Sequence, residues 1–289
     1  MLLAAARYLA SHRDFDGVAQ VIFQPAEEAG GGARRMIEDG LFEQFPMDAV
    51  FGMHNWPGLP AGTFGLTEGP IMASSSTFEI VVHGRGAHGA MPHLGVDPVV
   101  AAAQLTLAFQ TILTRDLDPL ESGVISVTQI HTGSADNVIP DQAVLRGTVR
   151  TLTHEALDLI ETRMRELTGP LVQALRCEAD FDFHREYPAT INHPRETALA
   201  TQVLTELAGA DKVNAMVRPS MGAEDFAFML QAKPGCYIWI GNGTGDHRTP
   251  GHGLGPCMLH NGSYDFNDRI IPLGAAYWVL LTQRFLGAR

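Results

Sequence analysis

The segment from Val18 to Gly32, VAQVIFQPAEEAGGG, constrains the fold of this chain more than any other. Its apolar run, Val18 to Phe23, has the length and β-branched content of a buried strand, and Pro25 would end that strand. Two adjacent carboxylates, Glu27 and Glu28, then precede a glycine cluster and a helix-like run. Open α/β sheets place their chemistry at the carboxyl ends of such strands. The sequence therefore predicts an α/β fold, with the glutamates in a functional loop and an ordinary solvated loop as the alternative.

Composition and charge narrow the class of protein. The 289 residues, 45% hydrophobic and 18% charged, suffice for one large or two modest domains. A net charge of −12 argues against nucleic acid or an anionic membrane as partner. No apolar run reaches the roughly 18 residues of a membrane span. Three widely spaced cysteines, Cys177, Cys236 and Cys257, predict reduced thiols and a cytoplasmic location.

The middle of the chain follows a different pattern from its two ends. Strand-like and helix-like segments alternate there as β-α-β-β-α-β, which is typical of a ferredoxin-like unit. The strands are expected at 78–83, 123–131, 143–151 and 179–187, and the helices at 98–113 and 154–176. The βα pattern of the first part resumes after Asn192. We therefore predict an α/β domain of residues 1–75 and 189–289, into which a ferredoxin-like domain of residues 76–188 is inserted.

Three further side chains are candidates for a metal site. A second short buried strand, Asp48 to Met53, ends at His54, so this histidine is expected just past a strand end. Glu28, His54 and His260 would then lie on one rim of the sheet, and carboxylate with imidazole suits zinc, manganese or cobalt. Their spacing is long and matches no compact metal motif. Scattered polar loop residues explain the same pattern equally well.

Six segments resemble one enzyme family. In chain order they read QPAEE, GMHNWPGLPAG, GRGAHGAMPHLGVDP, GSADNVIPDQAVLRGTVR, SMGAEDFAFM and LHNGSYDFND. Together they resemble the hippurate hydrolase and N-acyl-amino-acid amidohydrolase branch of the dinuclear metallo-aminoacylase and carboxypeptidase family. The resemblance implies a zinc-peptidase-like α/β catalytic domain with an inserted ferredoxin-like lid and dimerisation domain. It also implies metal-dependent hydrolysis of hippurate-like N-acyl amino acids to a carboxylic acid and a free amino acid.

The resemblance assigns roles to residues of the predicted α/β domain. Glu27 resembles the general base, Glu28 its neighbouring metal ligand, and His54 and His260 two further ligands. The complete protein would hold two divalent ions of zinc, manganese or cobalt. Such a cation lowers the pKa of bound water toward ~7, and a carboxylate can then accept the proton.

The inserted domain carries the other assigned residues. His88 resembles the lid histidine that reaches a substrate carbonyl, often in the site of the partner subunit, while Asn137 and Arg150 resemble lid residues that contact the substrate. The guanidinium of Arg150 suits the substrate carboxylate. In the predicted α/β domain, Glu224 and Asp225 are expected in supporting roles. The resemblance also implies a small-molecule substrate and a homodimer formed through this domain.

The chain departs from the family pattern at its start. Relatives carry a His-x-Cys-Gly-His-Asp-Gly-His segment immediately before the helix that corresponds to residues 1–11, and this chain lacks it. No cysteine stands in a comparable context, so two metal ligands are unreplaced. We therefore expect weak metal binding, poor hydrolysis and an exposed sheet edge or apolar face, and a truncated gene as the simplest origin. The alternatives are a dipeptidase or carboxypeptidase, another N-deacylase, or a catalytically inactive dimeric fragment.

Overall fold

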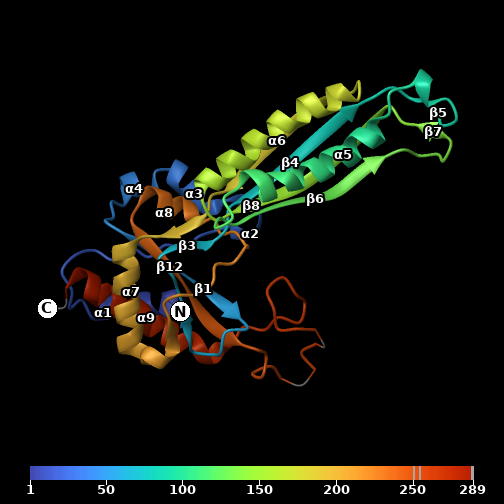
Figure 1. The fold of residues 1–289 in the computed structure, drawn as a ribbon. Coiled ribbons are helices and arrows are strands. Elements are labelled where there is room, and N and C mark those ends of the chain that lie inside the picture. The colour runs from blue at the N-terminus through green and yellow to red at the C-terminus, as the bar shows by residue number, and fades with distance from the viewer. Residues whose placement is uncertain (250, 254, 288–289) are drawn as a thin grey trace. The chain divides into compact units, whose positions relative to one another are not determined.

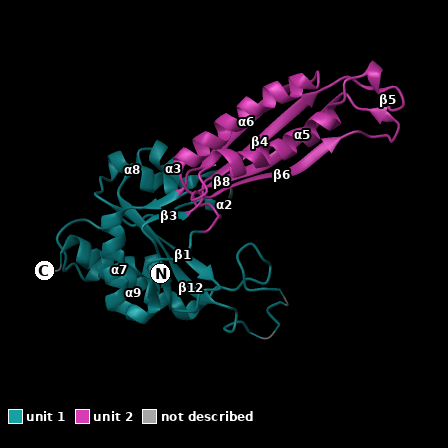
Figure 2. Cartoon of the chain, viewed as in Figure 1, with its two compact units in different colours: residues 1–71, 190–219, 225–289 teal, residues 72–189, 220–224 magenta. Residues whose placement is uncertain are grey.

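The structure is a computed structural model that describes residues 1–249, 251–253 and 255–287, and its fold is mixed α/β, as the sequence predicts (Figure 1). The chain forms two compact units (Figure 2). Unit 1 comprises Met1–Ile71, Thr190–Pro219 and Asp225–Arg289, and unit 2 comprises Met72–Ala189 and Ser220–Glu224. Among the described helices, none has the length and apolar character needed to cross a bilayer.

Unit 1 is organised around a four-stranded sheet in the order β1-β12-β2-β11. The central strand β12 is buried along nearly its whole length, because its sequence GCYIWIGNG is apolar on both faces. It runs parallel to β1 and antiparallel to β2, and β2 is parallel to β11. The bounds are β1 Val50–Pro57, β2 Phe64–Gly65, β11 Val213–Asn214 and β12 Gly235–Gly243. A second sheet pairs β3 (Gly69–Met72) with β10 (Thr190–Asn192).

Side chains of β12 alternate between the two faces of this sheet. Cys236, Ile238 and Ile240 are buried in the core that includes residues of α7 (Pro194–Ala208) and α9 (Ile271–Leu286). Helix α1 (Leu2–Ser11) packs on α9. On the opposite face Trp239 stacks on Trp56 of β1, with ring centroids 4.0 Å apart. The sheet therefore has a helix-covered aliphatic face and a face lined by aromatic rings.

The strand predicted at residues 18–23 is wrong. The structure assigns no strand to this segment, and the side chains of Val18 and Phe23 are 73% and 61% exposed. Strand propensity describes how well residues fit a pleated, half-buried surface, and this segment has no neighbouring strand among the described residues. The side chains of Val18 and Phe23 therefore face solvent and not a sheet core.

Short helices follow in the chain. They are α2 (Glu27–Gly30), α3 (Gly32–Glu38) and α4 (Leu41–Gln44), and α8 (Ala227–Ala232) packs on α3 and on β10. The helix-like run expected after the glycine cluster forms α3. Gly40 follows its C-cap with φ 90°, the left-handed conformation that favours glycine after a helix.

Unit 2 has the ferredoxin-like order that the sequence predicts. Its antiparallel sheet has the order β6-β8-β4-β9, and α5 and α6 contribute the helical side of its core (Figure 1). The bounds are β4 Ser75–His83, α5 Pro98–Thr111, β6 Gly123–Thr132, β8 Gln142–Thr151, α6 His154–Ala174 and β9 Glu178–Tyr187. Asp97 and Thr153 cap the two helices, because each side chain accepts a hydrogen bond from a first-turn amide. A two-stranded sheet, β5 (Ala87–His88) with β7 (Val138–Ile139), completes the unit.

Candidate metal and catalytic site

The two predicted catalytic glutamates lie on a single helical turn, α2. This turn is flanked by Ala26 with φ 50° and Gly31 with φ 60°. A left-handed alanine is uncommon, and such backbone strain concentrates at functional sites. The residue Glu27 is half-buried, whereas the side chain of Glu28 is 74% exposed. The turn thus presents one carboxylate to solvent and keeps its neighbour partly shielded.

His260 is the predicted ligand that the structure brings to Glu28. Its Nδ1 lies 3.7 Å from Glu28 Oε2, although the two residues are 232 positions apart in the chain. His260 also has a left-handed backbone, with φ 56°. A carboxylate and an imidazole at this separation are donors of the types that zinc and manganese accept. Glu28 and His260 therefore form the assembled part of the candidate site.

His54 lies inside β1, so its predicted place just past a strand end is wrong. The strand continues to Pro57 because β12 pairs with it as far as Gly243. His54 Nδ1 is 2.5 Å from the carbonyl oxygen of Asn55. A carbonyl only accepts, so Nδ1 carries the proton and the neutral ring keeps its lone pair on Nε2. This tautomer is the one in which Nε2 can bind a metal.

The donor set fits a divalent cation only in part. Glu28 and His260 have the right chemistry and lie together, and His54 has a suitable tautomer. Within the described ranges, however, no three His, Cys, Asp or Glu side chains come together as a metal-binding group. The site as seen is therefore a two-residue pair with a third candidate on β1.

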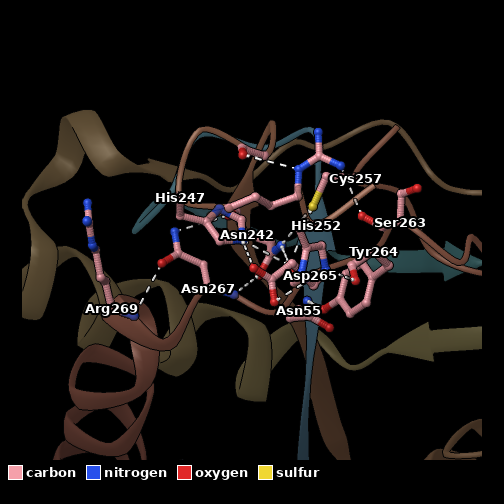
Figure 3. A network of polar contacts seen from close by, with 12 residues as sticks. Asn55, Asn242, His247, His252, Cys257, Ser263, Tyr264, Asp265, Asn267 and Arg269 are labelled. Carbon is pink, nitrogen blue, oxygen red and sulfur yellow. Dashed lines mark hydrogen bonds and ion pairs between the residues drawn. The ribbon is translucent and has the colours of Figure 1, made fainter. Parts of the chain in front are cut away.

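A polar network joins the loop of His260 to the strand of His54 (Figure 3). Asn55 Nδ2 donates a hydrogen bond to Tyr264 Oη, which links the segment after His260 to the residue after His54. Burial raises the pKa of Tyr264, and the hydrogen bond from Asn55 partly opposes that shift. Sequence reasoning missed this pair. The available signal was that GMHNW and HNGSYDFND each place a polar side chain close to a candidate histidine.

Further bonds fix the glycine-rich loop of residues 241–256, apart from Pro250 and Leu254, which lie outside the described residues (Figure 3). Asn242 Nδ2 donates to the carbonyl oxygen of Asp265 at 2.9 Å, and its Oδ1 accepts from the amide of Asn267 at 2.8 Å. Arg248 donates to the carbonyl oxygens of Gly255 and Ser263 at 2.9 and 3.0 Å. The segment that carries His260 is thereby held on both sides.

Unit 2 holds the predicted substrate-binding residues at two separate places. His88 and Asn137 are exposed neighbours, because the amide of Gly89 donates to the carbonyl oxygen of Asn137 at 2.7 Å. His88 Nδ1 accepts from the amide of Ala90 at 3.0 Å, so its neutral ring carries the proton on Nε2 and can donate it. Arg150 lies near the other end of β8. Arg150 lies eight positions after Gln142 in β8, roughly 26 Å of extended chain.

The comparison with known proteins decides the family. The profile of Peptidase family M20/M25/M40 matches residues 1–283. The chain belongs to this family. By family it is a hydrolase of the amidohydrolase and peptidase type, and the resemblance predicted from the six motifs is confirmed.

Named relatives agree on the class of reaction and differ in substrate. Hippurate hydrolase of Campylobacter jejuni is 39% identical over 285 residues, covering 99% of this chain and 71% of that protein. N-acetyl-L-cysteine deacetylase of Bacillus subtilis is 40% identical over 250 residues, covering 85% and 58%. A solved dinuclear metal binding peptidase of the M20 family from Bacillus subtilis is 30% identical, with a TM-score of 0.80 over 100% of this chain and 71% of that one. The family assignment therefore leaves the substrate to be determined.

Proposed function

We propose that this chain carries a metal-dependent amide-hydrolysing centre that converts hippurate-like N-acyl amino acids to a carboxylic acid and a free amino acid. The observation that carries the proposal is the pairing of Glu28 with His260 beside Glu27. Unit 1 would be the catalytic domain and unit 2 the lid and dimerisation domain. We also propose a cytoplasmic location, since the three cysteines are buried free thiols.

The protein groups divide the chemistry among them. Glu28 and His260 would hold a divalent cation, with His54 as a further ligand, and such a cation supplies acidification of water and polarisation of the amide carbonyl. Glu27 accepts the proton of the attacking water and delivers it to the leaving nitrogen. Nε2–H of His88 is suited to donate to the carbonyl oxygen as charge develops there. Asn137 and Arg150 would bind the substrate, Arg150 through its carboxylate. Because they lie at separate places on unit 2, His88 and Asn137 would serve the site of a second copy of the chain.

Substrate turnover with controlled metal content tests this proposal. The metal-free chain is incubated with N-benzoylglycine, N-acetyl-L-cysteine or a dipeptide, with added manganese, zinc or cobalt, and bound metal is measured by elemental analysis. We expect turnover of an N-acyl amino acid that requires added metal and stops on chelation, at a low rate because few ligands are assembled. Absence of both bound metal and turnover would favour the inactive dimeric fragment.

The described surface of unit 2 supports the homodimer. Strand β6 is at the edge of the sheet and pairs only with β8 among the described strands. Helix α5 is apolar on most of its circumference, and its exposed residues Val100, Ala103 and Leu107 follow the i, i+3, i+7 spacing of one face. An unpaired strand edge beside an exposed apolar helix face is typical of a protein interface. A second copy of the chain, related by a two-fold axis, would cover both.

Replacing Leu107 by Asp is expected to convert the dimer to a monomer. Leu107 is 70% exposed, and a carboxylate there would have to be desolvated against apolar groups of the partner. Sedimentation velocity at micromolar concentration measures the change. Leu120→Asp is the matched control, since Leu120 is 95% exposed in a loop of the same unit. A parent protein that sediments as a monomer at all concentrations would remove the dimer from the proposal.

A further inference from the structure

The buried carboxylate of Asp225 bonds to two segments that flank the glutamate turn. Asp225 is 0% exposed. Its Oδ1 accepts a hydrogen bond from Gln24 Nε2, and its Oδ2 accepts one from the amide of Ala33 at 2.7 Å. Gln24 precedes, and Ala33 follows, the residues 25–32 that carry the two glutamates. A buried carboxylate needs hydrogen-bond donors, and these two bonds supply one donor to each of its oxygens.

The segment between these two bonds is closed at its base. A Cβ added to Gly32 would lie only 1.8 Å from the carbonyl oxygen of Pro25, so the two ends of the segment are in direct contact. Inside it, the amide of Gly30 donates to the carbonyl oxygen of Ala26 at 3.0 Å. The result is a compact loop whose ends meet, as in an Ω-loop. Whatever holds the base of this loop also sets the position of Glu27 and Glu28.

Asp225 is itself held by the structure behind it. Its carbonyl oxygen accepts from the amide of Phe228 at 3.0 Å, at the start of α8. Helix α8 packs on α3 and on β10. The carboxylate therefore connects the base of the loop to packed secondary structure of unit 1.

We infer that Asp225 is a positioning residue that fixes the glutamate turn by accepting hydrogen bonds from both of its ends. The consequence for catalysis rests on the proposed function of Glu27 and Glu28. The direction of the hydrogen bond with Ala33 is fixed, because a backbone N–H can only donate. In the hydrogen bond with Gln24 both partners are side chains, so substitutions can exchange the donor and the acceptor.

A reversal of that polarity tests the inference. Gln24→Glu places a second carboxylate against Asp225, and the like charges repel at a buried site. In the double variant Gln24→Glu with Asp225→Asn, the amide nitrogen introduced at position 225 donates to the carboxylate at position 24. The amide oxygen at position 225 still accepts the hydrogen bond from the Ala33 amide. The control is Gln20→Glu, the same change at an exposed position four residues earlier. Hydrogen exchange of the Ala33 amide in the metal-free protein is the first readout, with amides of α9 as reference, and kcat and KM are the second.

The single variant Gln24→Glu is expected to raise exchange at Ala33 about 10- to 100-fold, the range for loss of a hydrogen bond to a charged group. Exchange in α9 stays unchanged, and kcat falls by a larger factor than KM rises. In the double variant, exchange at Ala33 and kcat return most of the way to the parental values. If exchange at Ala33 is unaffected by Gln24→Glu, or if the double variant shows no recovery, the inference is overturned. If exchange follows this pattern but no variant hydrolyses any substrate, the positioning role stands and the proposed function fails.

Discussion

Replacing Glu27 by Gln is expected to lower metal-dependent turnover by about 10²- to 10⁴-fold, the range for removal of a general base. Gln has nearly the same shape as Glu but cannot accept a proton at neutral pH. Glu27 takes no part in the Glu28–His260 ion pair, so we expect that pair to remain intact in this variant. The measurement is kcat for the best N-acyl amino acid substrate at saturating manganese, alongside manganese binding by calorimetry. We therefore expect kcat to fall while the affinity for manganese stays close to that of the parent.

The control for this substitution is Glu43→Gln in α4. Glu43 is exposed on a neighbouring short helix and takes no part in the site. Its substitution therefore makes the same change in charge as Glu27→Gln. Turnover in the control should equal that of the parent. A Glu27→Gln variant that keeps more than a tenth of the parental kcat would rule out Glu27 as the base. Equal loss of manganese binding and turnover would instead identify it as a ligand.

Helices were predicted well because their signals are local. The helices expected at 98–113 and 154–176 correspond to α5 and α6, which begin at the expected residues. The strands of unit 2 were predicted correctly because the whole β-α-β-β-α-β order is typical of one fold, in which each strand has known neighbours. The strand prediction for residues 18–23 failed because a strand also needs a neighbouring strand. The sequence of this segment does not specify such a neighbour.

The residues of the candidate site were predictable from the sequence, whereas their positions relative to one another were less so. The adjacency of Glu28 and His260 spans almost the whole chain, so the sequence predicted a shared rim of the sheet but not the contact itself. The place of His54 depended on how far β12 extends the pairing of β1. Asp225 was expected in a supporting role, but its bonds to Gln24 and Ala33 could not be inferred from spacing. Contacts between distant segments depend on packing, which no local pattern encodes.

Stability is expected to fall by about 4 kcal/mol between pH 9 and pH 12 through the thiol of Cys236 alone. Burial raises the pKa of this thiol from its ordinary value of 9.0 to about 12, and a hydrogen bond with Thr197 opposes the shift only in part. In this interval the folded chain keeps a proton that the unfolded chain has released. The unfolded state binds fewer protons, so the free energy of unfolding decreases as pH rises. The contribution is fully present below pH 9 and lost as pH approaches 12.

Urea unfolding under reducing conditions between pH 7 and pH 10.5 measures this loss. Cys236→Ala should give a shallower decline with pH than the parent, because the titrating thiol is gone. Buried Tyr277 in the same core, whose pKa burial raises well above its ordinary value of 10.0, adds to the decline above pH 10 in both proteins. Leu281→Ala is the control, since it removes packing from this core without a titrating group and should shift the curve equally at every pH. Parallel curves for the parent and Cys236→Ala would show that the thiol is not the group that titrates.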